Sequence, residues 1–346
     1  MTKYNNWFTS PYSAIFLTCI TFQSFISCSS NNERVNELNL FPSTIISQIN
    51  DSTFITDGVS HMSFVNENLL ISDRKALKTL SLNIKDLSVL FEIDHGFGPD
   101  NIKESYHIEY RKNRYYVSDF GKNTFSVFDA DRNPLSSINP PHSDMSSFLY
   151  KFSVDDNGYV YYTDITNNYP ITQLDQTGRV IREFGEFQPY ENEDHKRALN
   201  NRNLVVTEEN ELLSIWTSVP IIKKFNQEGN LIDELDLSDF FQFRTNRKLE
   251  LIKTNPQYKY RLAFAYYNDV YYSDKKLYLL FIGDYEVPNS NQVLVIDTSK
   301  KRMQIQKVLN LHLPEAYFKE ITISGSKLWA FDKAGAEIIE FKMDLK

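Results

Sequence analysis

The feature that most constrains the fold is a strand-like run that recurs along the chain. Its three clearest copies read NENLLISD, KNRYYVSD and DNGYVYYTD, and successive copies end 46 and 45 residues apart. Repeats of about 40–50 residues are typical of β-propeller blades. Two of the six copies lack the terminal aspartate. The copies end at Asp73, Asp119, Asp164, Thr217, Phe281 and Asp332.

Third and fourth strands extend most of these units. Turns rich in Asp, Asn and Gly, such as residues 129–133 (DADRN) and 175–178 (DQTG), separate them and tolerate the positive φ of tight hairpins. The sequence therefore predicts an all-β fold, a six-bladed β-propeller of four-stranded antiparallel blades. The sixth unit shows only three clear strands. We expect the early segment 43–49 (STIISQI) to complete it and close the ring.

One stretch of the predicted propeller, which spans residues 38–346, does not follow the repeat. Residues 240–265 read FFQFRTNRKLELIKTNPQYKYRLAFA and combine charged residues with a helical turn or two over 246–253. This stretch is interpreted as an insertion between the fourth and fifth units.

The amino terminus predicts a lipoprotein signal peptide over residues 1–27. Its apolar run, residues 14–22, is too short to span a bilayer. The segment FISC ends at Cys28 and resembles a bacterial lipobox, with Phe25 where Leu is usual. Lipidation of Cys28 would leave residues 28–37 as a tether and hold the protein at the cell envelope, on the outer membrane. The alternative is an ordinary secretory signal with a coincidental cysteine.

Charge and cysteine content exclude several functions. The formal net charge of -8 argues against a nucleic-acid partner, which calls for a basic face. The two cysteines, Cys19 and Cys28, precede the repeats. The propeller therefore has no disulfide partner, thiolate zinc site or cysteine nucleophile. No Gly-x-Ser-x-Gly motif is present, so the chain shows no catalytic signature.

The lipobox, the six units and the segment GFGP at residues 96–99 together resemble a known group. They are similar to the six-bladed propeller lipoproteins of Bacteroidota, described as TolB-like or NHL-like. The resemblance covers roughly residues 38–345. It implies a fold and an envelope location, and because most members lack an established activity, it implies no chemistry.

The repeat register predicts a polar ring at the mouth of the central channel. In a propeller the first strand of each blade lines the channel, and its start lies beside the end of the second strand. Two imidazoles, an ammonium and two carboxylates would share one rim and could bind a polar ligand or a metal ion. Unit four offers Asn203 or Leu204 instead. The ring residues are His61, His107, Lys151, Asp269 and Glu320.

Each of these features has a plainer interpretation. The histidines could be satisfied strand-end residues, and the repeated aspartates are expected to hydrogen-bond the turns that follow them. The acidic pairs 155–156 and 208–209 are expected as solvated tips on the opposite rim. Three aromatic residues near rim-proximal strand ends are candidates for ligand contact, namely Trp216, Trp329 and Tyr285.

These observations favour a non-enzymatic envelope lipoprotein that binds a ligand or scaffolds a partner protein. Its partners would be the membrane, through the lipid anchor, and an envelope protein or extracellular ligand. One alternative is a metal-dependent hydrolase or lyase of the lactonase type, with its site at the channel rim. Only that alternative calls for a cofactor, a metal ion in the channel. Another is a carbohydrate-binding protein of the envelope.

Overall fold

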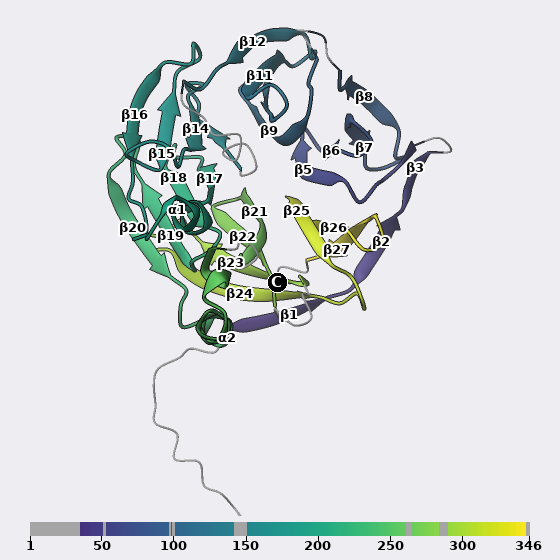
Figure 1. Ribbon diagram of the computed structural model, residues 1–346. Helices are drawn as coiled ribbons and strands as arrows, with labels where there is room; N and C mark the ends of the chain where they lie inside the picture. Colours follow the sequence, from purple (N-terminus) through teal and green to yellow (C-terminus); the bar gives the residue numbers. More distant parts are fainter. Residues whose placement is uncertain are drawn as a thin grey trace, which may run out of the picture. The chain divides into compact units, whose positions relative to one another are not determined.

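The computed structural model describes residues 35–343 except 51–52, 97, 99–100, 142–150, 261–264 and 284–289. Within these residues, six blades of four antiparallel strands surround a central axis, as predicted (Figure 1). The innermost strands of neighbouring blades contact one another around the ring. Residues 1–34, which include Cys28, lie outside the described part.

Tight hairpins join the two inner strands of each blade. In blades one, two and five the hairpin turn has two consecutive residues at positive φ, as in Asn66 (50°) and Glu67 (65°), which is the geometry of a type I′ turn. The first strands are β5 (Val59–Val65), β9 (Ser105–Arg111), β13 (Ser153–Val154), β17 (Arg202–Val206), β21 (Tyr267–Ser273) and β25 (Phe318–Ser324). The second strands are β6 (Asn68–Asp73), β10 (Arg114–Asp119), β14 (Val160–Thr163), β18 (Leu212–Trp216), β22 (Lys276–Phe281) and β26 (Lys327–Asp332).

The outer half of each blade is more exposed and more twisted. A register shift interrupts the pairing of third and fourth strands in every blade, and such bulges increase the local twist. The third strands are β7 (Lys78–Asn83), β11 (Thr124–Asp129), β15 (Ile171–Leu174), β19 (Ile221–Phe225), β23 (Gln292–Asp297) and β27 (Glu337–Lys342). The fourth strands are β8 (Val89–Asp94), β12 (Pro134–Ile138), β16 (Val180–Phe184), β20 (Leu231–Asp236), β24 (Gln304–Leu311) and β2 (Pro42–Ile46).

An early strand closes the ring, as predicted, but over different residues. β2 pairs antiparallel with β27, and the Ser43 hydroxyl donates to the Glu340 carboxylate at 2.7 Å. The strand ends at Ile46, and β3 (Gln48–Asn50) pairs instead with β4 (Thr53–Phe54). β1 (Asn36–Leu40) adds a parallel fifth strand to blade five. The segment before blade one is therefore paired with two neighbouring blades.

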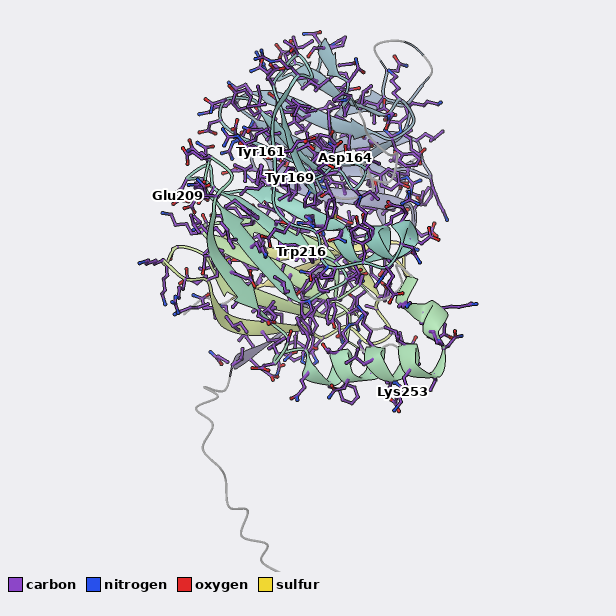
Figure 2. All side chains as sticks on the ribbon, turned by 60° about the vertical axis from the view of Figure 1, so that its left-hand side comes forward. Tyr161, Asp164, Tyr169, Glu209, Trp216 and Lys253 are labelled. Carbon is purple, nitrogen blue, oxygen red and sulfur yellow. The ribbon has the colours of Figure 1, made fainter. Side chains whose placement is uncertain are left out.

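Two helices interrupt the repeat. α1 (Glu193–Asn200), which the sequence analysis missed, begins where the Asn192 side chain accepts the His195 N–H. α2 (Gln242–Thr254) and the 3₁₀ helix η2 (Pro256–Tyr260) lie within the interval 240–265 (Figure 2). α2 is longer than the helical turn or two predicted over 246–253. None of the described helices is long and apolar enough to cross a membrane.

The repeated aspartates hydrogen-bond the following turns, as predicted. Asp73 Oδ1 accepts the backbone N–H groups of Lys75 and Ala76, each at 3.0 Å. Its Oδ2 accepts the N–H of Thr56, in the segment that enters the same blade. Equivalent pairs of contacts occur at Asp119 and Asp332. In these three blades the aspartate is therefore a structural residue that joins the two ends of the inner hairpin.

Candidate ligand site in the central channel

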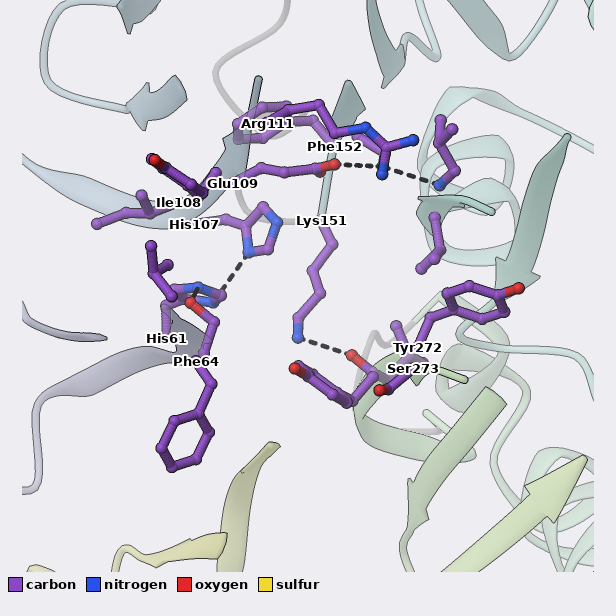
Figure 3. A pocket seen from close by; sticks show the side chains of 18 of the residues that line it. His61, Phe64, His107, Ile108, Glu109, Arg111, Lys151, Phe152, Tyr272 and Ser273 are labelled. Carbon is purple, nitrogen blue, oxygen red and sulfur yellow. Dashed lines mark hydrogen bonds between the residues drawn. The ribbon is translucent and has the colours of Figure 1, made fainter. Parts of the chain in front are cut away.

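The five predicted ring residues lie inside the channel rather than at its mouth. His61 and Asp269 are only 2% and 1% exposed. Residues just before the ring positions, such as Tyr106 and Lys319, line a cavity of about 520 Å³. Residues just after them line a second cavity of about 340 Å³ on the other side (Figure 3). The ring thus separates two open ends of the channel.

We name the two cavities by their walls. The lysine cavity is the larger one, and its basic residues are Arg74, Lys75, Lys319 and Lys333. The aromatic cavity is the smaller one, and its aromatic residues are Phe64, Tyr110, Phe152, Tyr271 and Tyr272.

The two histidines form a direct pair. Their Nδ1 atoms are 3.0 Å apart, and the rings meet edge to face with centroids 4.4 Å apart. Burial, reinforced by the nearby Lys151 ammonium, lowers the pKa of His61 well below its usual value. Burial and the His61 ring do the same to the pKa of His107. Both rings are therefore neutral, so that one Nδ1–H donates to the other Nδ1 lone pair. The remaining His61 Nε2 is 3.0 Å from the Ser63 hydroxyl.

The other three ring residues form a neutral cluster. Lys151 Nζ lies 2.6 Å from Asp269 Oδ1 and donates to the Val270 carbonyl at 2.7 Å. Burial lowers the pKa of Lys151, but the Asp269 and Glu320 carboxylates outweigh burial and raise it overall. Burial, with the Asp269 charge, raises the pKa of Glu320 well above its usual value. One ammonium, one carboxylate and one neutral acid therefore leave no net charge.

Blade four adds no ionisable group to the ring. Asn203 Oδ1 accepts the Lys151 N–H at 3.0 Å, and Leu204 is 1% exposed. This blade fixes the backbone at Lys151 and leaves its ammonium free to reach Asp269.

The expected aromatic ligand contacts are wrong where they can be examined. Trp216 is fully buried within blade four and stacks against the Arg202 guanidinium, 4.0 Å from its ring centroid (Figure 2). Trp329 is 2% exposed and packs beside Phe64. Tyr285 lies outside the described residues.

A second layer of channel residues escaped the sequence analysis. Side chains two positions apart on a strand point to the same face, so four of the five ring residues have a follower deeper in the aromatic cavity. Applying this period to the ring would have found them. The followers that line the cavity are Ser63, Glu109, Ser153 and Tyr271.

Glu109 is the ionisable member of this second layer. Its Oε1 accepts the Ser153 hydroxyl at 3.0 Å. Burial raises the pKa of Glu109 to about 7, against the opposing effects of the Val154 backbone and Ser153 hydrogen bonds. The carboxyl group therefore exchanges its proton near neutral pH, as general bases and pH-sensitive binding groups do.

Of the four acidic residues at the first hairpin turns, three are exposed as expected and only Asp155 differs. Asp155 is 3% exposed and accepts the Tyr161 hydroxyl at 3.1 Å. Asp156 pairs with Arg111 at 2.7 Å. Glu208 is exposed as expected, lines the aromatic cavity and accepts the Tyr272 hydroxyl at 3.2 Å.

The ring does not fit a metal ion. Among the described residues, no group of three or more His, Cys, Asp or Glu side chains is arranged to hold one. The Lys151 ammonium already occupies the position beside Asp269 that a cation would need. The two imidazoles direct Nδ1 at each other instead of at a common point.

Comparisons with known proteins identify the fold. No family model matches the chain. No curated protein matches it either. Among solved structures, a Bacteroides fragilis protein described as exported matches at 12% identity and a TM-score of 0.55, over 85% of this chain and 88% of that one. A streptogramin B lyase matches at 16% identity with a TM-score of 0.53, over 87% of this chain and 98% of that one. Virginiamycin B lyase from Staphylococcus aureus matches at 13% identity with a TM-score of 0.50, over 82% of this chain and 80% of that one. Similarity at this level shows a shared β-propeller fold and transfers no reaction.

Proposed function

We propose that this protein is a lipoprotein of the bacterial cell envelope, anchored through Cys28, that binds a small ligand in the aromatic cavity. The observation that carries the binding role is the cavity itself. Its volume of about 340 Å³ lies within the range of small-molecule sites. Aromatic walls with a few convergent polar groups are also typical of such sites.

The anchor rests on the sequence before the propeller. FISC ends at Cys28, and the polar residues after it suit a flexible tether. The first described residue is Val35, so the intervening chain could extend by about 25 Å at most. Lipid chains bound to Cys28 would keep the propeller close to the membrane surface, on the outer membrane of the cell. The Bacteroides fragilis protein of similar fold, which is described as exported, is in keeping with this location.

A blocked cavity tests the binding role. Ser273 lines the aromatic cavity at the end of β21, and Ser324 has the same register position in β25 without lining it. Full-length protein is incubated with the small-molecule extract of a bacterial culture and examined by native mass spectrometry. We expect a bound mass that disappears in Ser273→Trp and persists in Ser324→Trp. Equal binding by both variants, or no bound mass on any protein, would contradict the proposal. A bound neutral sugar would support it.

The anchor has its own test. Full-length protein expressed in a bacterial host should incorporate radiolabelled palmitate, and Cys28→Ala should not. Cys19→Ala is the matched control and should be labelled like the unaltered chain. Equal labelling of Cys28→Ala would show that the cysteine is not the anchor.

A further inference from the structure

We propose that the ligand of the aromatic cavity is an organic cation, a protonated amine on an apolar or aromatic group, whose ammonium binds the Glu109 carboxylate. This inference rests on the proposed function and specifies the chemical class of its ligand.

The charges of the cavity wall provide the first argument. Arg111 and Lys151 are its cations, and each is paired with a carboxylate that is not part of the wall. Arg111 lies 2.7 Å from Asp156, which Lys112 shares at 3.4 Å, and Lys151 lies 2.6 Å from Asp269. Glu109 and Glu208 line the same cavity and form no ion pair among the described residues. The cavity therefore has an excess of negative charge once both carboxyl groups are ionised.

The position of Glu109 provides the second argument. The carboxyl group accepts hydrogen bonds from the Ser153 hydroxyl and the Val154 backbone, and it lies one strand period from His107 in the second layer. An ionised carboxylate removed from water is unfavourable unless an opposite charge accompanies it. An ammonium group would supply that charge. The faces of Tyr271 and Tyr272 would in turn receive the apolar part of the ligand and favour its positive charge.

The opposite end of the channel has the opposite charge. Arg74 and Lys75 are paired there with Glu104 and Asp57, whereas Lys319 and Lys333 form no ion pair in the described part of the chain. The ring between the cavities is neutral. An amine is therefore attracted to the aromatic cavity and repelled from the lysine cavity, and this field selects for a cation.

Among the groups that face Glu109, only its own carboxyl group changes charge near pH 7. Burial keeps both histidines neutral, and the pKa of Lys151 is raised. The pKa of Tyr116 and that of Tyr271 are raised by burial, so the phenols stay neutral. A pH step in ligand affinity near neutrality therefore reports Glu109. The facing groups are His107 and Arg111 on β9, Tyr116 on β10, His61 on β5, Lys151 before β13 and Tyr271 on β21.

A matched pair of probes tests the inference. 2-Phenylethylamine and 2-phenylethanol share a ring and a chain length but differ in charge. Their affinities for the full propeller are measured by isothermal titration calorimetry from pH 5.5 to pH 8. We expect the association constant of the amine to rise about thirtyfold over this range as Glu109 ionises, whereas that of the alcohol stays constant. An amine that binds no more tightly than the alcohol at pH 8 would overturn the inference.

Two isosteric variants locate the effect. Glu109→Gln should abolish the pH step, and Glu208→Gln should weaken amine binding slightly while retaining the step. An unchanged step in Glu109→Gln would also overturn the inference. The proposed function can survive this failure. A neutral or anionic molecule that native mass spectrometry detects in the cavity, and that Ser273→Trp excludes, would support binding and refute the cation. Amine binding unaffected by Ser273→Trp would count against both.

Discussion

The two ends of the central channel are built from the same six first strands, yet they differ in charge and lining. The lysine cavity is bordered by residues before the ring and has two ammonium groups that form no ion pair among the described residues, Lys319 and Lys333. The aromatic cavity is bordered by residues after the ring and has two carboxyl groups, Glu109 and Glu208, that lack an ion-pair partner in the described part of the chain. A shift of a few residues along a strand thus separates a basic end from an acidic, aromatic end. The repeated fold fixes where channel residues lie, and the individual residues decide which ligand each end can accept.

The ring that separates the two cavities depends most on the Lys151–Asp269 ion pair. Asp269→Asn leaves the Lys151 ammonium buried without its charge partner. We expect a loss of about 3–5 kcal/mol in the free energy of unfolding, measured by urea denaturation at pH 7. Lys151→Met combined with Asp269→Asn should recover much of this loss, because no charge then remains unpaired. A single variant as stable as the unaltered chain would show that the pair does not hold the ring together.

The next largest effect concerns Glu109 alone. Its pKa in the folded state is raised to about 7, so the folded protein retains a proton that the unfolded chain has lost. Stability therefore falls as pH rises from about 4.5 to about 7, and then stays level. Glu109→Gln should remove this slope and make the protein about 2–3 kcal/mol more stable at pH 8, with no gain at pH 4.

Urea denaturation at the two pH values measures this difference, and Glu208→Gln is the control because its carboxyl group is exposed. A variant that is less stable than the unaltered chain at pH 8 would contradict the assignment. A gain there fits a binding group whose stability cost is borne for function.

The histidine pair should have a smaller effect on stability, and with the opposite pH dependence: stability is lost as the pH falls. The pKa of each ring is lowered in the folded state, so the pair contributes stability above about pH 6.5 that is lost as the pH falls below it. His61→Phe leaves His107 Nδ1 without its partner and should cost about 1–2 kcal/mol at pH 7. His61→Phe with His107→Phe should unfold with less dependence on pH between 6.5 and 5. An unchanged acid slope would show that the pair titrates normally.

Substitutions at the lysine cavity should have the smallest effects on stability and on amine binding. Lys319→Gln with Lys333→Gln removes two charges that form no ion pair in the described part of the chain, so stability should change by about 0.5 kcal/mol or less. Binding of 2-phenylethylamine should be unaffected or slightly tighter, because a repulsive charge is removed. Weaker amine binding in this variant would place the amine at the wrong end of the channel.

The sequence predicts the scaffold well because the same physical demand recurs in every blade. In four of the six units an aspartate follows or ends the second strand and bonds backbone N–H groups of the next turn, so its spacing reports the repeat directly. The ring residues could be located for the same reason, since register places the first strands around the axis. β1 was missed because parallel pairing with a strand nearly 270 residues away leaves no local pattern.

The chemistry of the channel was harder to predict. The ring suggested a ligand or metal site, but the Lys151–Asp269 pair and the His61–His107 pair satisfy most of its polar atoms internally. Glu109 was recoverable from the period-two rule applied to His107. Glu109 has no ion-pair partner among the described residues, whereas Arg111, two residues later, pairs with the Asp156 carboxylate of the next blade. Such pairings appear only when the ring is assembled.

Crystals of the protein soaked with 2-(4-bromophenyl)ethylamine at pH 8 would test the central claim most directly. We expect an anomalous bromine peak inside the aromatic cavity, with the ammonium nitrogen at hydrogen-bond distance from the Glu109 carboxylate, and no peak in crystals of Ser273→Trp. A peak in the lysine cavity, or none in the channel, would contradict it.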